Sequence, residues 1–250
     1  MLGDATPFLL LLVGIGLVVV VAVGAWTLDR KRREAMFAWC ATHGWSYVGE
    51  DESLTYRWSG APFGTGERRR ARNVMRGPVG DRQAVVFDYS YETSSTDSKG
   101  NRTTTTHRFA VVAVGLPVPL PRLQVTPDNV FKRAAAAIGL GDEDIHLESD
   151  EFNKRFRVTA RDRKFAFDVL HPRLMHALLA AEPVAWRFEG SDLLSWDSGR
   201  LGPDQALVRA MMLSSVVDAV PTFVWKDRGY DPSAAGPSPA NPWQGSEETS

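Results

Sequence analysis

Residues 83–116 read QAVVFDYSYETSSTDSKGNRTTTTHRFAVVAVGL, and this stretch decides the fold. In 83–93 and again in 102–116, large apolar residues alternate with smaller or polar ones, which is typical of half-buried β-strands. The connection, residues 94–101, is polar and contains a Gly-Asn pair that favours a turn. We therefore predict a long antiparallel hairpin from strands 83–93 and 102–116.

Further strands and helices are predicted on both sides of this hairpin. Short apolar or alternating runs predict strands at 45–49, 70–79, 122–125, 145–147 and 155–160, and a second hairpin of 184–188 and 193–196 around 189–192. Thr126 and Pro127 are typical of the first residues of a helix, which Gly139 would end. Asp162 is expected to cap a helix that Pro172 interrupts and that resumes to Ala181, and a last helix is expected over 203–220.

The order of these elements predicts the fold class. Hairpins with helices inserted between them favour an α+β fold with a mainly antiparallel sheet and packed helices. A parallel sheet would need a regular alternation of strands and helices, which is missing here. Between residues 45 and 225 the chain is long enough for one domain with a substantial core.

The N-terminal run from residue 8 to residue 28 carries no charge and is followed directly by Asp29-Arg30-Lys31-Arg32-Arg33. A helix of this length matches the thickness of a bilayer, so the sequence predicts one transmembrane helix. Cations after the span place the N-terminus outside and the following domain in the cytoplasm. A cleaved signal peptide is the alternative, but it would carry its cations before a shorter apolar core.

The predicted organisation of the chain has five parts. They are a short extracytoplasmic N-terminus (1–7), the transmembrane helix (8–28), a basic junction with a helical extension that Gly44 ends (29–44), a cytoplasmic α+β domain (45–225) and a disordered tail rich in Pro, Ser and Gly (226–250).

Composition excludes several classes of function. The formal net charge is −1, and no sustained basic excess of the kind that binds nucleic acid is present. Cys40 is the single cysteine, so neither an intramolecular disulfide nor a cysteine cluster for a metal can form within one chain.

Catalytic and metal motifs are missing as well. The sequence has no Gly-x-Ser-x-Gly elbow, and its five histidines form no His-Glu-x-x-His pair. Residues 142–144 are acidic but lack the spacing of a calcium loop, so a solvated turn is expected there. We therefore predict no catalytic, cofactor-binding or metal-binding residues, and an enzyme of unfamiliar type is the least favoured function.

Two basic runs are candidates for contact with a membrane. Arg30, Lys31, Arg32 and Arg33 are expected at the membrane interface. Arg68, Arg69, Arg70 and Arg72 are weaker candidates for anionic lipid, because a basic cluster near a bilayer attracts anionic head groups. The alternative for this second run is a charged, solvated strand.

The aromatic residues allow two interpretations. The predicted strands carry Tyr89, Tyr91, Trp186, Phe188 and Trp196, which would lie together if these strands expose them on the same face of the sheet. This face would then either line a ligand pocket or fill a core. Core packing explains them more simply.

Several segments of the chain resemble a known family of proteins. They are residues 150–158 (DEFNKRFRV), Asp162 and residues 170–175 (LHPRLM), together with 109–114 and 125–127. Over residues 34–190 the chain resembles a family of uncharacterised actinobacterial single-span membrane proteins. The resemblance implies a membrane anchor and one cytoplasmic domain, and it brings no activity, cofactor or catalytic residue. Phe152 and Phe156 are one helical turn apart and are expected to pack into the core.

Two functions remain open after these exclusions. The first is a non-catalytic protein-interaction or scaffolding module, tethered to the bilayer, that holds a cytoplasmic or membrane protein as its partner. The second is a lipid-binding or small-molecule-binding module at the inner membrane surface, which would require a pocket.

Overall fold

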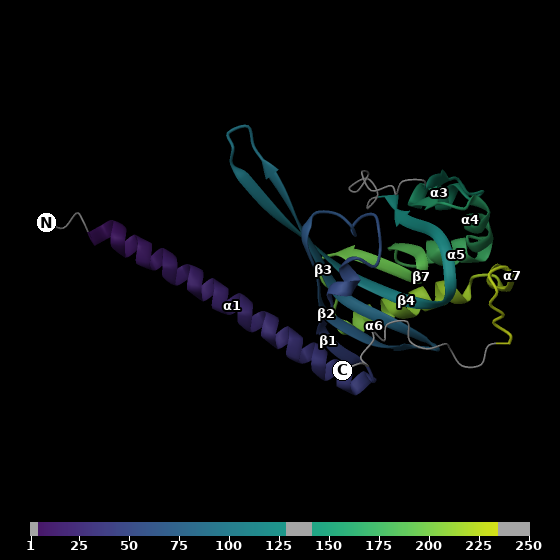
Figure 1. The fold of residues 1–250 in the computed structure, drawn as a ribbon, viewed down its shortest axis with the longest axis horizontal. Coiled ribbons are helices and arrows are strands. Elements are labelled where there is room, and N and C mark those ends of the chain that lie inside the picture. The colour runs from purple at the N-terminus through teal and green to yellow at the C-terminus, as the bar shows by residue number, and fades with distance from the viewer. Residues whose placement is uncertain (1–4, 129–141, 235–250) are drawn as a thin grey trace, which may run out of the picture.

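The computed structural model describes residues 5–128 and 142–234; the side chains of residues 5–10 and of Val13 are not described. In chain order the elements are α1 (Ala5–His43), β1 (Ser46–Glu50), η1 (Glu52–Thr55), β2 (Glu67–Val79), β3 (Arg82–Thr96), β4 (Arg102–Pro127), β5 (Glu143–Ile145), α3 (Asp150–Arg155), β6 (Phe156–Ala160), α4 (Arg163–Val169), α5 (Pro172–Ala180), β7 (Ala185–Ser198), α6 (Pro203–Asp218) and α7 (Thr222–Lys226). Figure 1 shows a helix-covered sheet from which α1 projects.

The strands of the described residues form one antiparallel sheet in the order β1-β2-β3-β4-β6-β5, with β7 also paired to β4. The predicted α+β class with an antiparallel sheet is therefore confirmed. Its centre is the predicted hairpin, whose strands β3 and β4 pair continuously from Ala84 and Val114 to Thr96 and Arg102. After residue 115, β4 bends and continues to pair with β6 and with the first half of β7.

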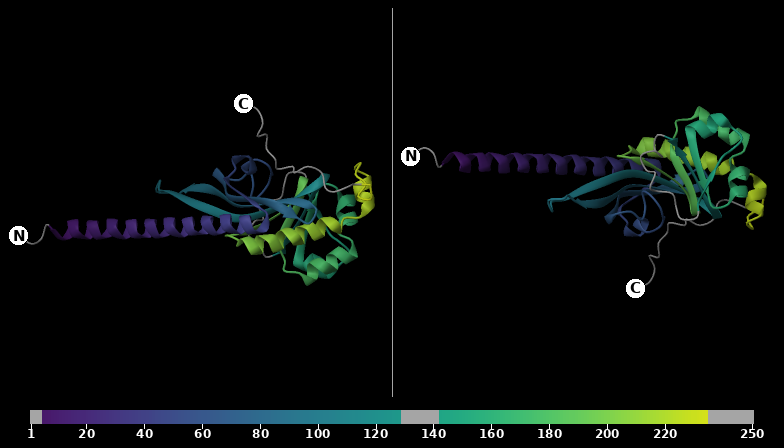
Figure 2. Two further views of the ribbon diagram at one scale, coloured as in Figure 1. Left: turned by 90° about the horizontal axis from the view of Figure 1, so that it is seen from below. Right: turned by 90° about the horizontal axis from the view of Figure 1, so that it is seen from above.

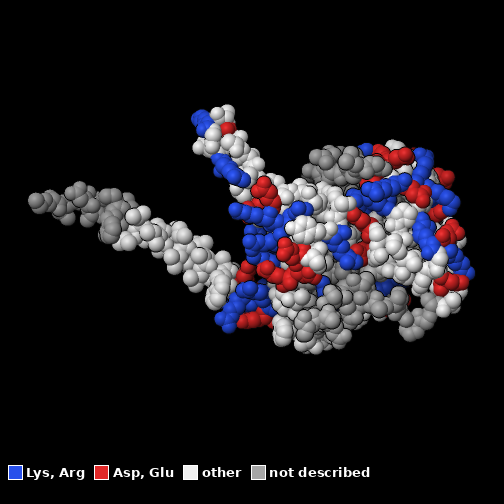
Figure 3. Space-filling model, in the orientation of Figure 1, with Lys and Arg blue, Asp and Glu red and all other residues white. Residues whose placement is uncertain are grey.

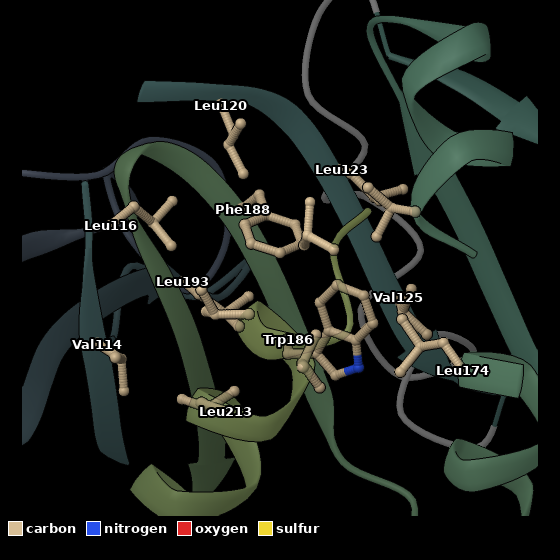
Figure 4. Packing of buried hydrophobic residues seen from close by; sticks show 14 of the residues in the cluster. Val114, Leu116, Leu120, Leu123, Val125, Leu174, Trp186, Phe188, Leu193 and Leu213 are labelled. Atoms are coloured by element: carbon tan, nitrogen blue, oxygen red, sulfur yellow. The ribbon is translucent and has the colours of Figure 1, made fainter. Parts of the chain in front are cut away.

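Each face of the sheet carries its own core. On one face, side chains such as Val86 and Val112 pack with the C-terminal part of α1 and with α6, and this core continues to Trp186, Phe188 and Leu174 of α5 (Figure 4). On the other face, Phe87 and Val111 pack with Phe63 of the segment between η1 and β2. Because successive side chains of a strand point to opposite faces, one hairpin supplies both cores.

The N-terminal helix extends to His43, as predicted, and Gly44 follows it with a φ of +69°. Among the described residues, none of the helices combines the length and apolar composition needed to cross a membrane. The structure thus does not support the predicted span over residues 8–28, of which residues 8–10 and Val13 have side chains outside the description.

The second predicted hairpin is wrong. Residues 185–198 form one continuous strand, β7, without a reversal at 189–192. Its two halves pair with the same partner, since Trp186 lies opposite Val125 and Trp196 lies opposite Val111. Gly190, with a φ of +59°, lies where the register shifts, so the turn-forming residues bend the strand along β4 instead of reversing it.

The predicted helix begins one residue later than expected, because Asp128 is its first described residue. Thr126 and Pro127 are the last residues of β4, where they pair with Arg157 and Phe156 of β6. Pairing with a neighbouring strand overrides the capping preference of these two residues. The body of that predicted helix, residues 129–139, lies outside the described residues.

Other local signals are confirmed. The Asp162 carboxylate accepts a hydrogen bond from the Phe165 amide at 3.0 Å, which caps α4, and Pro172 is the first residue of α5. Phe152 and Phe156 are buried with their ring centroids 4.8 Å apart.

The predicted disordered tail is described only in its first part. Residues 235–250 lie outside the described residues. Before them, Tyr230 packs against Trp225 with ring centroids 6.1 Å apart, so the packed chain extends beyond the predicted boundary at residue 225.

Candidate functional site: a basic pocket between the N-terminal helix and the sheet

The sheet face that α1 covers changes from apolar to polar along β3. Ala84 and Val86 are buried in its core, and the next residues on the same face are Asp88, Ser90 and Glu92, which are half-buried. Both halves follow from the period of two along a strand. The polar half lies toward the β3–β4 connection, at the end of the domain from which α1 projects (Figure 2).

A pocket of about 340 Å³ lies over this polar half. β2, β3, β4, the segment after β7 and α1 all contribute to its lining. Its arginines are Arg68, Arg70, Arg72, Arg108 and Arg200, and its acids are Asp29, Asp88 and Glu92. Figure 3 shows basic side chains, with acidic ones among them, gathered between the hairpin and α1. The lining therefore has more cationic than anionic side chains.

Each acid of the pocket has a basic partner. Asp88 lies 3.0 Å from Arg32 of α1. Glu92 lies 3.2 Å from Arg68, and Asp29 of α1 lies 3.3 Å from Arg200. Two of these three ion pairs join α1 to the rest of the domain, so α1 forms a fixed wall of the pocket.

Two bulges in β2 shape the other wall. The register with β3 shifts between Glu67 and Arg70 and again between Arg72 and Met75. Arg68 and Asn73, the residues inside these bulges, have positive φ values of 51° and 52°. Such bulges reorient side chains. Asn73 donates a hydrogen bond to Asp88 at 2.7 Å, which fixes the floor of the pocket.

The structure divides the predicted basic residues into several groups. Arg68, Arg70 and Arg72 line the pocket, whereas Arg69 does not and instead lies over the Tyr56 ring at 5.0 Å. Of the junction residues, Arg32 binds Asp88 and Arg33 lines an adjoining pocket of about 190 Å³.

The other two junction residues lie outside both pockets. Arg30 pairs with Glu34 at 2.8 Å along the helix, and Lys31 is exposed.

Several residues of the pocket were not candidates from the sequence, and Ser90, Arg108 and Arg200 are among them. Arg108 was part of the predicted hairpin, but only the register shows that it lies opposite Ser90. No sequence signal placed Arg200 near α1.

The predicted aromatic face is wrong in its arrangement. Trp186 and Phe188 belong to the core under α6, while Tyr89, Tyr91 and Trp196 belong to the opposite core. All five are buried and packed on opposite faces of the sheet, so they form no shared ligand face, although Tyr89 and Tyr91 also border the basic pocket.

Tyr89 provides a test of this packing. Burial raises its pKa to about 12, and the nearby Arg69 opposes this shift. Since an unfolded tyrosine has a pKa of about 10, the folded state holds a proton that the unfolded state loses between these values, and stability falls as the pH rises from 10 to 12. In a tyrosinate absorbance titration, Tyr89→Phe is expected to remove the last titrating tyrosine and to flatten this loss of stability. An unchanged titration would contradict the assignment.

A second charged cluster has a structural explanation. Arg187, which is fully buried, donates a hydrogen bond to the Ser59 carbonyl at 2.8 Å and pairs with Glu189 at 2.8 Å. Arg122 pairs with Asp142 at 2.8 Å and also donates to the Ser59 carbonyl. These contacts hold the segment between η1 and β2 against β4 and β7. The described residues contain no group of His, Cys, Asp or Glu that suits a metal ion.

Comparison with known proteins adds one likeness. No family model matches the chain, and no curated protein matches it significantly. Among solved structures, the chain is similar to the crystal structure of the mycobacterial trehalose monomycolate transport factor A, TtfA, with a TM-score of 0.55 and 16% sequence identity over 76% of this chain and 95% of that one. At this identity, the likeness concerns the fold alone.

Proposed function

We propose that this protein is a non-catalytic module at the inner membrane surface that binds the anionic head groups of lipids in its basic pocket. The observation that carries this proposal is the excess of arginine in a pocket beside the projecting helix α1. Of the two functions expected from the sequence, the pocket favours the lipid-binding or small-molecule-binding module over the scaffolding module.

The exposed surface of α1 supports the proposed location at the membrane. Large apolar side chains are exposed along this helix before the junction: Leu11, Leu12, Ile15, Leu17, Val18, Val19, Val20, Val21, Val23, Trp26 and Leu28. An exposed apolar surface of this kind is typical of a segment that is covered by lipid or protein. We propose that lipid covers it and that the domain lies on the cytoplasmic side of the membrane, because the cations follow the apolar run.

Two further observations support the proposal. The β3–β4 hairpin and α1 project from the same end of the domain, so a membrane that holds α1 would face the pocket (Figure 2). The similar solved structure carries a name that refers to trehalose monomycolate transport, which is compatible with a lipid-related role.

The test uses the full chain in nanodiscs of phosphatidylcholine alone or of phosphatidylcholine mixed with phosphatidic acid. Anionic lipid is expected to slow hydrogen exchange in residues 67–73 and 106–110, because head groups occupy the pocket, and high salt is expected to weaken the effect. Exposed segments of α5, on the far side of the domain, serve as the internal control. Equal exchange in both nanodiscs would refute the proposed function.

A further inference from the structure

We propose that the pocket contains one defined site for a single phosphoryl group, held between Arg70 and Arg108 above Ser90. This inference rests on the proposed function and deepens it, because it replaces a diffuse attraction to anionic lipid with a specific ligand chemistry. A phosphorylated lipid head group and a free phosphate compound share that chemistry.

The register of the sheet places these three residues in one row. Arg70 of β2 lies opposite Ser90 of β3, and Ser90 lies opposite Arg108 of β4. Directly opposite residues of antiparallel strands have their Cβ atoms about 5 Å apart on the same face. The two arginines therefore flank the serine, with about 9.5 Å between their strands. Both arginines are exposed, so their guanidinium groups can reach a ligand.

The charges of the pocket leave this row without a counter-ion. The two acids on either side of Ser90 along β3 are occupied: Asp88 by Arg32 and Glu92 by Arg68. Arg72 pairs with Glu50 at 2.9 Å, and Arg200 pairs with Asp29. Within the described part of the chain, Arg70 and Arg108 have no such ion pair. The positive charges of Arg70 and Arg108 thus lie on either side of the neutral Ser90.

A phosphoryl group fits this arrangement better than a carboxylate does. Each guanidinium plane binds best to two oxygen atoms at once, and two arginines on opposite sides require more oxygens than one carboxylate offers. A phosphate monoester has three terminal oxygens and a charge of about −1.5 to −2 at neutral pH, which balances two arginines. The Ser90 hydroxyl supplies a further donor from the floor of the pocket.

Calorimetric titration of the full chain in neutral detergent micelles with inorganic phosphate tests the site. Wild-type protein is expected to bind one phosphate, and Arg70→Gln and Arg108→Gln are each expected to weaken binding about tenfold or more, since each removes a bidentate contact. The matched control is Arg69→Gln, the neighbouring arginine on β2 whose side chain lies over Tyr56, and its affinity is expected to stay at the wild-type value.

The melting temperature separates binding from folding. Arg70→Gln and Arg108→Gln are expected to melt at or above the wild-type temperature, because they remove repulsion between like charges. A lower melting temperature in both variants, or equal loss of binding in Arg69→Gln, would overturn the site. Absence of phosphate binding by the wild type would overturn it as well.

The nanodisc experiment distinguishes failure of the defined phosphoryl site from failure of the proposed function. Phosphate binding without protection by phosphatidic acid, a lipid whose head group is a phosphate monoester, would keep the site and assign it to a soluble phosphorylated compound, against the proposed function. Protection by phosphatidic acid that Arg70→Gln and Arg108→Gln leave intact would keep the proposed function and refute the defined site.

Discussion

The Glu189→Gln variant is expected to unfold with a free energy about 3 kcal/mol below that of the wild type, because removing one partner of a buried ion pair leaves an uncompensated charge. Glu189 lies 2.8 Å from Arg187 and 3.3 Å from Arg122, and both arginine side chains are buried. Burial, followed by the repulsion of Arg122, lowers the pKa of Arg187 to about 10, so this arginine stays charged at neutral pH. In the variant, two buried cations share the charge of Asp142.

Urea unfolding of the full chain in neutral detergent micelles, followed by circular dichroism, measures this effect. The matched control is Glu148→Gln, at an exposed position before α3, which is expected to change the free energy of unfolding by less than about 0.5 kcal/mol. Arg187 also donates hydrogen bonds to the Ser59 carbonyl and to the Gln124 amide oxygen. Equal effects of the two substitutions would mean that these two acceptors are sufficient for the Arg187 guanidinium without Glu189.

Local patterns in the sequence predicted most of the elements. The alternation in 83–93 and 102–116 predicted the central hairpin, and residues such as Asp162 and Pro172 predicted where helices begin. These signals act over a few residues, so the sequence alone contains them. The buried cluster around Arg187 had no such signal, because its members come from distant parts of the chain.

The errors occurred where pairing partners decide the structure. Residues 189–192 resemble a turn, yet β4 is long enough to pair with both halves of β7, so the chain bends instead of reversing. Thr126 and Pro127 resemble a helix start, yet β6 extends the sheet to them. Local propensity cannot reveal a partner that is distant in sequence.

The candidate site was predicted in part for the same reason. The basic run at 68–72 was visible, and three of its arginines line the pocket. Side chains alternate between the two faces of β2, which explains why Arg69 lies outside the pocket. The two bulges that decide which residues face the pocket are not evident from the sequence. Arg108 joins the site through the register of two strand pairs, which no local pattern specifies.

The position of α1 relative to this site depends on the close contact of Trp45 with Gly77. Trp45 follows α1, and its ring lies directly on the backbone of β2, where a Cβ atom at Gly77 would be 2.2 Å from the Trp45 Cγ. The ring has little room to move, because it is buried and packs edge-to-face with Trp39 at 5.7 Å. Only glycine permits this contact at position 77.

Gly77→Ala is therefore expected to lower the free energy of unfolding by about 1–3 kcal/mol, the usual cost of an overpacked core. Because the displaced ring belongs to the connection between α1 and the sheet, hydrogen exchange in residues 29–43 should also become faster. Urea unfolding by circular dichroism and exchange of the full chain in micelles provide the two measurements.

A double-mutant cycle with Trp45→Leu identifies the cause of this loss. The smaller leucine leaves room for the added methyl group, so the double variant is expected to lose about 1 kcal/mol less than the sum of the single variants. Additive losses would show that Gly77 is needed for the backbone of β2 itself and not for the contact with Trp45. Coupled losses, together with faster exchange in 29–43, would show that this contact fixes the helix that forms one wall of the basic pocket.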